Sequence, residues 1–156
     1  MIVEEIMTRK VITIKSSDTL YKAQSLMVKN SIRHLPVVQK KELEGIITES
    51  DIRGAFVQND KITSRVAILD PKNMKVADFM TSNPQIVQPD TNIEDAALLI
   101  YKNKIGSLPV IKDNKLVGII SILDMLGLFI DLMGIIHSSS RVDVIMGKEP
   151  KNFEAV

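Results

Sequence analysis

The protein has 156 residues, of which 45% are hydrophobic and only 4% aromatic, enough for one globular domain or two small halves that share an aliphatic core. Its 20 basic and 19 acidic residues leave a net charge of +1, which gives no general attraction to nucleic acid or to an anionic membrane. The absence of cysteine excludes disulfides, thiolate catalysis and cysteine metal sites, and two histidines are too few for a multi-histidine metal site.

The chain opens with a short apolar segment that also carries acid. A signal peptide would need basic residues there, so Glu4 and Glu5 favour a cytoplasmic protein. Val3 to Met7 predicts a helical turn, and the β-branched residues of Val11 to Ile14 predict a short strand.

A helix and a hairpin should follow this strand. Apolar residues recur at helical spacing between a cap at Asp18 or Thr19 and a helix end near Asn30. Leu35 to Val38 predicts a second strand, and a short polar turn separates it from a third, Leu43 to Ile47. Because the connection is so short, the two strands should form an antiparallel hairpin.

The third strand ends in the motif Gly45-Ile46-Ile47-Thr48-Glu49-Ser50-Asp51, which predicts a buried strand that turns at once into a helix. Thr48 would be the N-cap, and the carboxylate of Asp51 follows three residues later. Free backbone amides at such a helix start favour an anion, so the motif is a plausible phosphate seat. The same residues also fit a capping box, in which both side chains satisfy amides and bind nothing, and both interpretations stay open here.

The same order of elements returns in the second half of the chain. Val3 to Phe56 aligns with Val76 to Phe129 without a gap, and Gly118 to Asp124 repeats the motif with Ser121 as the N-cap. One β-α-β-β-α unit has too few short strands to bury a core alone. We therefore expect an α/β (α+β) fold in which two repeats pack with pseudo-two-fold symmetry.

The domain boundaries follow from this alignment. The repeats should span residues 2–56 and 76–133, joined by a polar linker, 57–75, that contains proline but no glycine. In the second repeat, Thr91 and Glu94 predict a capping box at the start of the long helix.

The final helix is apolar nearly all round, yet shorter than the roughly 20 residues that span a bilayer. A helix this apolar on a small domain should be covered, so we expect a homodimer through the repeat helices, with burial inside the monomer as the alternative. In the tail, 134–156, Arg141 to Met146 alternates polar and apolar residues like a strand.

Each unit has Met-Thr near its start, Leu-Pro-Val before the hairpin and Gly-Ile-Ile-Ser/Thr-x-x-Asp at its end. Together these motifs resemble a tandem pair of CBS domains, a Bateman module, over residues 2 to 133. Ile32 to Val38 and the tail further resemble AcuB-type acetoin-utilisation proteins, in which an ACT-like domain follows the CBS pair. On that resemblance, the tail would be the start of a missing ACT-like domain.

The resemblance implies regulatory sensing of an adenosine-containing ligand (AMP, ADP, ATP or S-adenosylmethionine) in clefts between the repeats. Asp51 and Asp124 would accept hydrogen bonds from ribose hydroxyls, and Thr48 and Ser121 would contact phosphate. The segments that enter the first strands would line the adenine pocket, with the site residues Ile12, Thr13, Pro84, Gln85 and Ile86.

Two further residues precede the Leu-Pro strand, where the family places groups that face phosphates. They are Arg33 and His34 in the first repeat, whereas the second has Gly106 and Ser107. We therefore expect the cleft that receives Arg33 and His34 to prefer more phosphate. The alternatives are a solvated charge for Arg33 and a satisfied structural imidazole for His34.

The competing function is a structural dimerisation module whose Thr/Ser-x-x-Asp units are only helix caps. An enzyme is least supported, because the sequence has no Ser-His-Asp pattern of recognisable spacing and no Walker loop. We accordingly expect no catalytic residues, no metal, and neither nucleic acid nor membrane as a partner.

Overall fold

The computed structural model describes residues 1–61 and 70–134. The first repeat comprises a 3-10 turn, a helix, a hairpin and a second helix: η1 (Val3–Glu5), α1 (Leu20–Asn30), β1 (His34–Gln39), β2 (Glu42–Thr48) and α2 (Glu49–Lys61). The second repeats this order with one additional short strand: η3 (Val76–Asp78), β3 (Thr81–Ser82), α3 (Ile93–Asn103), β4 (Ser107–Lys112), β5 (Lys115–Ser121) and α4 (Ile122–Leu132). The expected mixed α/β architecture with a duplicated unit is confirmed.

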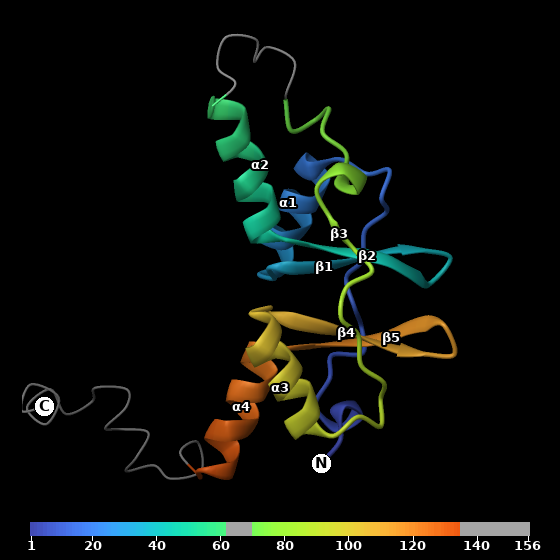
Figure 1. Cartoon of the computed structure of the whole chain (residues 1–156), viewed down its shortest axis with the longest axis vertical. Coiled ribbons are helices and arrows are strands. Elements are labelled where there is room, and N and C mark those ends of the chain that lie inside the picture. Colours follow the sequence, from blue (N-terminus) through green and yellow to red (C-terminus); the bar gives the residue numbers. More distant parts are fainter. Residues whose placement is uncertain (62–69, 135–156) are drawn as a thin grey trace, which may run out of the picture.

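The two hairpins lie side by side in the middle of the molecule, with α1 and α2 on one side and α3 and α4 on the other (Figure 1). Both hairpins are antiparallel, as predicted, and both carry a bulge at the same place, after Val37 and after Val110. Their tips touch, because the Leu116 amide donates to the Lys41 carbonyl at 2.9 Å.

The predicted first strand is wrong in extent. In place of a strand over Val11 to Ile14, one parallel bridge joins Ile14 to Val37, and Val87 bridges Val110 in the same way. Only the last residue of the β-branched segment reaches the hairpin, so β-propensity alone overstated its length.

The helix ends give a mixed result for the predicted caps. Thr19 caps α1, with its hydroxyl accepting from the Lys22 amide at 3.2 Å. The capping box predicted for Thr91 and Glu94 is wrong: Asn92 is the N-cap of α3, without a side-chain bond. The Thr91 hydroxyl instead accepts from the Gln88 amide at 3.0 Å, so the preceding turn uses it.

Two expected segment boundaries change or fall outside the structure. Helix α2 continues to Lys61, into the segment predicted as linker, and α4 ends before Gly134, which has φ +67° as a helix-ending glycine should. The strand expected at 141–146, and with it the ACT-like continuation, lies outside the described residues.

Each hydrophobic core contains the entry segment of the other repeat. Val3 and Met7 pack in the core of the second repeat, and Met74 and Val76 pack in the core of the first. Backbone bonds fix both crossings: the Val3 amide donates to the Thr91 carbonyl, and the Val76 amide to the Asp18 carbonyl, each at 2.8 Å. Neither repeat can complete its hydrophobic core alone, so the two repeats must pack together, as predicted from the duplication.

The glycine that opens each motif serves this exchange. A Cβ at Gly45 would lie 2.6 Å from the Thr81 carbonyl oxygen, and one at Gly118 would lie 2.5 Å from the Met7 sulfur. The entry segment of the opposite repeat therefore passes directly over each glycine, so a larger residue would force that segment or its side chains to move.

Candidate functional site

The two Thr/Ser-x-x-Asp motifs form capping boxes of identical geometry. Oδ2 of Asp51 accepts from the Thr48 amide at 2.8 Å and from its hydroxyl at 3.0 Å, while the Asp51 amide donates to that hydroxyl at 3.2 Å. Ser121 and Asp124 repeat all three bonds at the same distances. Both acids therefore turn Oδ2 towards their own backbone, and the capping bonds expected of the motif are present in both repeats.

The capping boxes leave few free amides at either helix start. The first amide of α2, that of Glu49, donates to the Arg33 carbonyl, and that of Ile122 in α4 donates to the Gly106 carbonyl, each at 3.0 Å. Within the described residues, the amides left unpaired in the first turns are those of Ser50 and Leu123. A bound anion would thus find one backbone donor per helix rather than the several that the sequence suggested.

Part of each carboxylate also stays available. Asp51 and Asp124 are half-buried, and the bonds that their carboxylates make to other described residues all involve Oδ2. Oδ1 of each acid can accept a hydrogen bond from a hydroxyl group, so the capping role and a ligand-binding role are chemically compatible.

Strand register gathers most of the predicted residues at one end of each hairpin. His34 pairs with Thr48, and Ser107 pairs with Ser121, so the start of β1 lies beside the start of α2 and the start of β4 beside that of α4. Because the Ile14 bridge is parallel, the residues before it run back towards that same end. The structure thus brings Ile12 and Thr13, both half-buried, to the neighbourhood of Thr48. The same geometry brings Pro84 and Gln85 towards Ser121.

Arg33 and His34 differ in their surroundings. Arg33 makes an exposed ion pair with Glu49, Nε to Oε2 at 3.5 Å, which matches the solvated-charge alternative and contributes little stability. The His34 ring is half-buried and lies against Gly106 of the other repeat, where Nε2 occupies the space that a Cβ would need. Burial lowers the pKa of His34 and Arg33 adds to this, while Asp51 and Glu49 partly oppose it.

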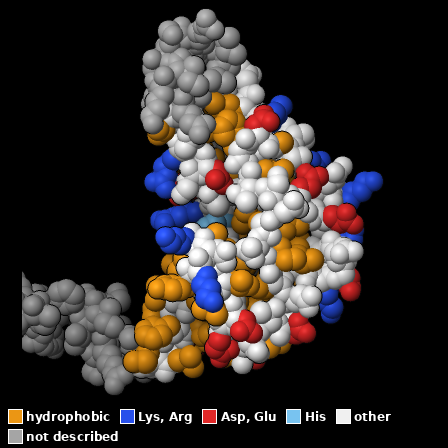
Figure 2. All heavy atoms as spheres, viewed as in Figure 1, with side chains coloured by type: hydrophobic (Ala, Val, Ile, Leu, Met, Phe, Trp, Pro, Cys, Tyr) orange, Lys and Arg blue, Asp and Glu red, His pale blue; other side chains and the backbone are white. Residues whose placement is uncertain are grey.

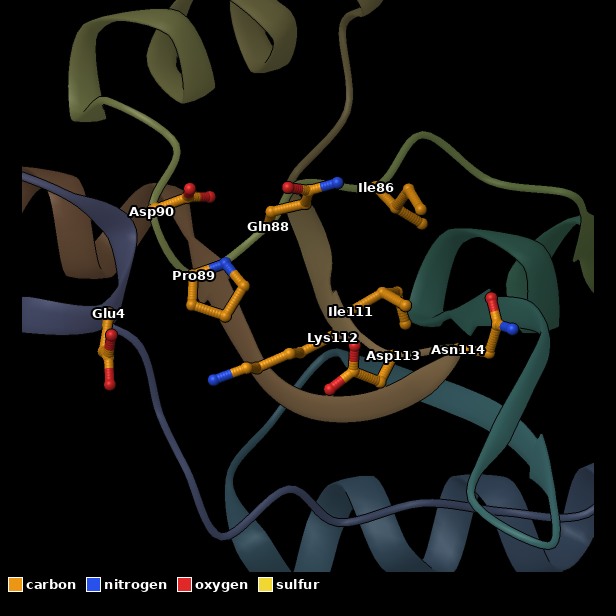
Figure 3. Close-up of a pocket in the computed structure, with 9 residues that line it drawn as sticks. All are labelled: Glu4, Ile86, Gln88, Pro89, Asp90, Ile111, Lys112, Asp113 and Asn114. Carbon is orange, nitrogen blue, oxygen red and sulfur yellow. The ribbon is translucent and has the colours of Figure 1, made fainter.

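Ile86 lines a hollow that contains none of the other predicted site residues. Its side chain is 45% exposed and lines an open hollow of about 530 Å³ between its own turn and the β4–β5 turn (Figure 3). The rest of the lining is Glu4, Gln88, Pro89, Asp90, Ile111, Lys112, Asp113 and Asn114, without either motif carboxylate. In residues 1–61 and 70–134, no three His, Asp or Glu side chains are grouped to hold a metal ion.

The duplicated geometry agrees with a comparison to known families. Residues 3–58 and 76–131 each match the CBS domain. The chain belongs to the CBS-domain family. Its tandem CBS pair is a regulatory module of a generally non-catalytic kind. No helix in the described parts of this CBS pair is long and apolar enough to cross a membrane.

Similar solved structures cover nearly the whole CBS pair. An acetoin utilization protein, AcuB, from Vibrio cholerae is 31% identical, with a TM-score of 0.72 over 89% of this chain and 97% of that one. The CBS pair of protein MJ0100, in complex with 5'-methylthioadenosine and S-adenosyl-L-methionine, is 29% identical, with a TM-score of 0.72 over 83% and 95%. CBSX2 in complex with AMP is 28% identical, with a TM-score of 0.70 over 85% and 98%.

Curated relatives carry a CBS pair inside longer proteins. A homoserine O-acetyltransferase of Methanococcus vannielii is 38% identical over 122 residues, 77% of this chain and 23% of the relative. An inosine-5'-monophosphate dehydrogenase of Methanocaldococcus jannaschii is 34% identical over 125 residues, 79% of this chain and 22% of the relative. The chain thus spans less than a quarter of these relatives, and the likeness concerns their CBS portions.

One polar residue of the CBS pair was not predicted as a site residue. Ser107 is the first residue of β4 and is only 4% exposed. It follows Gly106, which lies against the His34 ring. The sequence marked this position only by a difference between the repeats: the second has Gly106 and Ser107 where the first has Arg33 and His34.

Proposed function

We propose that this CBS pair is a regulatory module that senses an adenosine-containing ligand (AMP, ADP, ATP or S-adenosylmethionine) between its repeats. The observation that carries the proposal is a pair of equivalent sites. Thr48–Asp51 and Ser121–Asp124 have the same hydrogen-bond geometry, and Oδ1 of each aspartate can accept a bond from a ligand. Both units lie on hairpins that contact each other. Two similar structures, at 28% and 29% identity, hold AMP, and 5'-methylthioadenosine with S-adenosyl-L-methionine.

Each predicted residue then has a defined task. Oδ1 of Asp51 and of Asp124 accepts from ribose hydroxyls, and the one unpaired amide at each helix start donates to phosphate. A phosphate contact by the Thr48 or Ser121 hydroxyl requires its proton to turn away from Oδ2 of the aspartate. Arg33 can exchange its exposed, weak ion pair for a phosphate, which keeps the higher phosphate preference on the side of the first repeat. The adenine would lie against the segments that enter the bridges, Ile12–Thr13 or Pro84–Gln85.

The exchanged entry segments explain how binding could be transmitted. Each core includes part of the other repeat, so the repeats stay joined, and the hairpin tips are tied by the bond from Leu116 to Lys41. The ends near His34 and Gly106 lie at the opposite end of the hairpins, where the His34 ring rests against Gly106 and would have to move for the separation to change. A ligand held there shifts the relative orientation of the repeats, and a partner or appended domain reads the shift.

An apolar face supports the second part of the proposal, a homodimer through the repeat helices. Leu123, Leu126, Phe129 and Leu132 of α4 are 48% to 74% exposed, and Figure 2 shows hydrophobic side chains gathered over that corner of the molecule. A patch of this kind on a small module is best covered by a second copy.

Thermal melting with adenine ligands separates sensing from the structural alternative, which the inward-turned carboxylates support. A ligand at about 100 times its dissociation constant should add roughly 2.7 kcal/mol of stability. Melting curves that do not move with AMP, ADP, ATP or S-adenosylmethionine would leave the module with a purely structural role.

A further inference from the structure

The middle of the junction between the repeats does not distinguish one repeat from the other. Val3 and Val76 are equivalent in the alignment, and each packs in the core of the opposite repeat. Gly45 and Gly118 are equivalent too, and each has the opposite entry segment directly over it. This part of the junction would serve equally well to join two like repeats from two copies of the chain, as happens in domain swapping. The choice of partner therefore depends on positions where the repeats differ.

The hairpin tips carry opposite charges at equivalent positions. Glu42 opens β2 and Lys115 opens β5, and the alignment makes these two residues equivalent. Lys115 Nζ lies 3.6 Å from Glu42 Oε1 and donates to the Lys40 carbonyl at 3.1 Å. Two first repeats joined in this geometry would bring glutamate against glutamate, and a carboxylate cannot donate to the Lys40 carbonyl. Two second repeats would bring lysine against lysine, so either like pair is penalised by charge.

The opposite end of the junction discriminates by shape. The His34 ring lies against Gly106, with Nε2 in the space that a Cβ would need and Cε1 2.9 Å from that position. The residue equivalent to Gly106 is Arg33, which carries a Cβ. Two first repeats would therefore drive each His34 ring into Arg33. Two second repeats would place Ser107 there instead and leave the volume of the ring unfilled, which also destabilises a packed interface.

We infer that the junction is coded at both ends for unlike repeats, by charge at Glu42 and Lys115 and by shape at His34 and Gly106, so that a first repeat accepts a second repeat and rejects another first repeat. Each contact is weak alone, because the ion-paired side chains are 46% and 63% exposed and an imidazole can turn aside. In a like pair both contacts fail, so the two penalties act together against the wrong partner. Since both repeats are on one chain, the nearest acceptable partner is the other repeat of the same molecule.

Charge reversal places inside one chain the residue pairs that like repeats would present. Lys115→Glu creates the glutamate pair and Glu42→Lys the lysine pair, and each should lower the melting temperature by about 2–4 °C at low salt. The loss should shrink in about 1 M salt, where charges more than about 3 Å apart are screened. The double reversal should recover the loss, because it rebuilds the ion pair with its ends exchanged. Lys112→Glu, at an exposed lysine of the same hairpin, is the control, which Glu42→Lys should not rescue.

Gly106→Ala tests the end that discriminates by shape. The added methyl group is the first atom of an arginine side chain and should displace the His34 ring. Burial lowers the pKa of His34 in the unchanged protein, so displacement should raise that pKa towards its ordinary value in an imidazole NMR titration. His34→Gln identifies the signal, since the chain has two histidines. In a His34→Ala background, Gly106→Ala should cause no further loss of stability, because the ring supplies the three nearest atoms to the new methyl group.

Two results would overturn the inference, which requires both ends. One is a double reversal of Glu42 and Lys115 that melts no higher than the less stable single reversal at low salt. The other is a Gly106→Ala variant in which both the melting temperature and the pKa of His34 stay unchanged. Recovery in the double reversal together with a raised pKa in Gly106→Ala is the result that the coded junction predicts.

Discussion

Adding one methyl group to Gly45 should strongly destabilise this protein. The new Cβ would lie 2.6 Å from the Thr81 carbonyl oxygen and 2.9 Å from the Met80 sulfur, and the oxygen belongs to the backbone of β3, paired to β2. Overpacking of this kind costs about 1–3 kcal/mol, and a backbone obstacle places Gly45→Ala near the upper value.

The matching change in the second repeat should be milder. At Gly118 the nearest atom, at 2.5 Å, is the sulfur of the flexible Met7 side chain, while the Thr8 carbonyl oxygen is 3.1 Å away. Methionine can move aside, so we expect about 1 kcal/mol for Gly118→Ala. Gly54 and Gly127 have nothing within 4 Å, and alanine in these helices should stabilise the protein by about 0.5–1 kcal/mol.

Thermal and urea unfolding of the four variants provide the assay. For a chain of this size, 1 kcal/mol shifts the melting temperature by roughly 2–4 °C, so Gly45→Ala should melt about 6–12 °C lower. No effect of either Gly45→Ala or Gly118→Ala would refute the crossing of the entry segments over these glycines, and equal effects would refute the distinction between a backbone obstacle and a movable side chain. The two helical variants control for any general effect of replacing glycine.

Three further predictions concern the site and the apolar face. Asp51→Ala and Asp124→Ala should each cost about 1 kcal/mol of stability by removing a cap, and should also weaken AMP binding in calorimetry; unchanged affinity in both would refute the assigned roles. Leu126→Glu should convert a dimer to a monomer in analytical ultracentrifugation, and a monomeric unchanged protein would contradict the homodimer. Because the pKa of His34 is lowered in the folded state, its stability contribution is complete above pH 6.5 and is lost as pH falls below it. Urea unfolding at pH 7.5 and 5.5 should show this loss, and His34→Gln should reduce it.

Much of the fold could be predicted because the signals are local and duplicated. The short turn between two β-branched segments fixed each hairpin, and helical spacing after Thr19 fixed α1. The motif around Thr48 and Asp51 also gave the correct strand-to-helix turn, though the sequence alone left both phosphate binding and capping open. Local patterns decide which elements form, and the alignment of the halves decides that they form twice.

What escaped prediction depends on how the two copies meet. The entry segments around Met7 and Met80 are equivalent in sequence, so nothing local says that each packs on the opposite repeat. The partner of the Glu49 amide is the Arg33 carbonyl, a contact that exists only once β1 and α2 are placed side by side. The burial of Ser107 likewise follows from the face of β4 that meets the first repeat, not from its neighbours in sequence.

The most direct test of the sensing proposal is an amide NMR titration of the full chain with AMP. We predict that the Ser50 and Leu123 amides, which have no partner among residues 1–61 and 70–134 at the two helix starts, shift together with the signals of Asp51 and Asp124. A spectrum that stays unchanged at millimolar AMP, or shifts confined to the open hollow lined by residues 86–90 and 111–114, would contradict binding between the repeats.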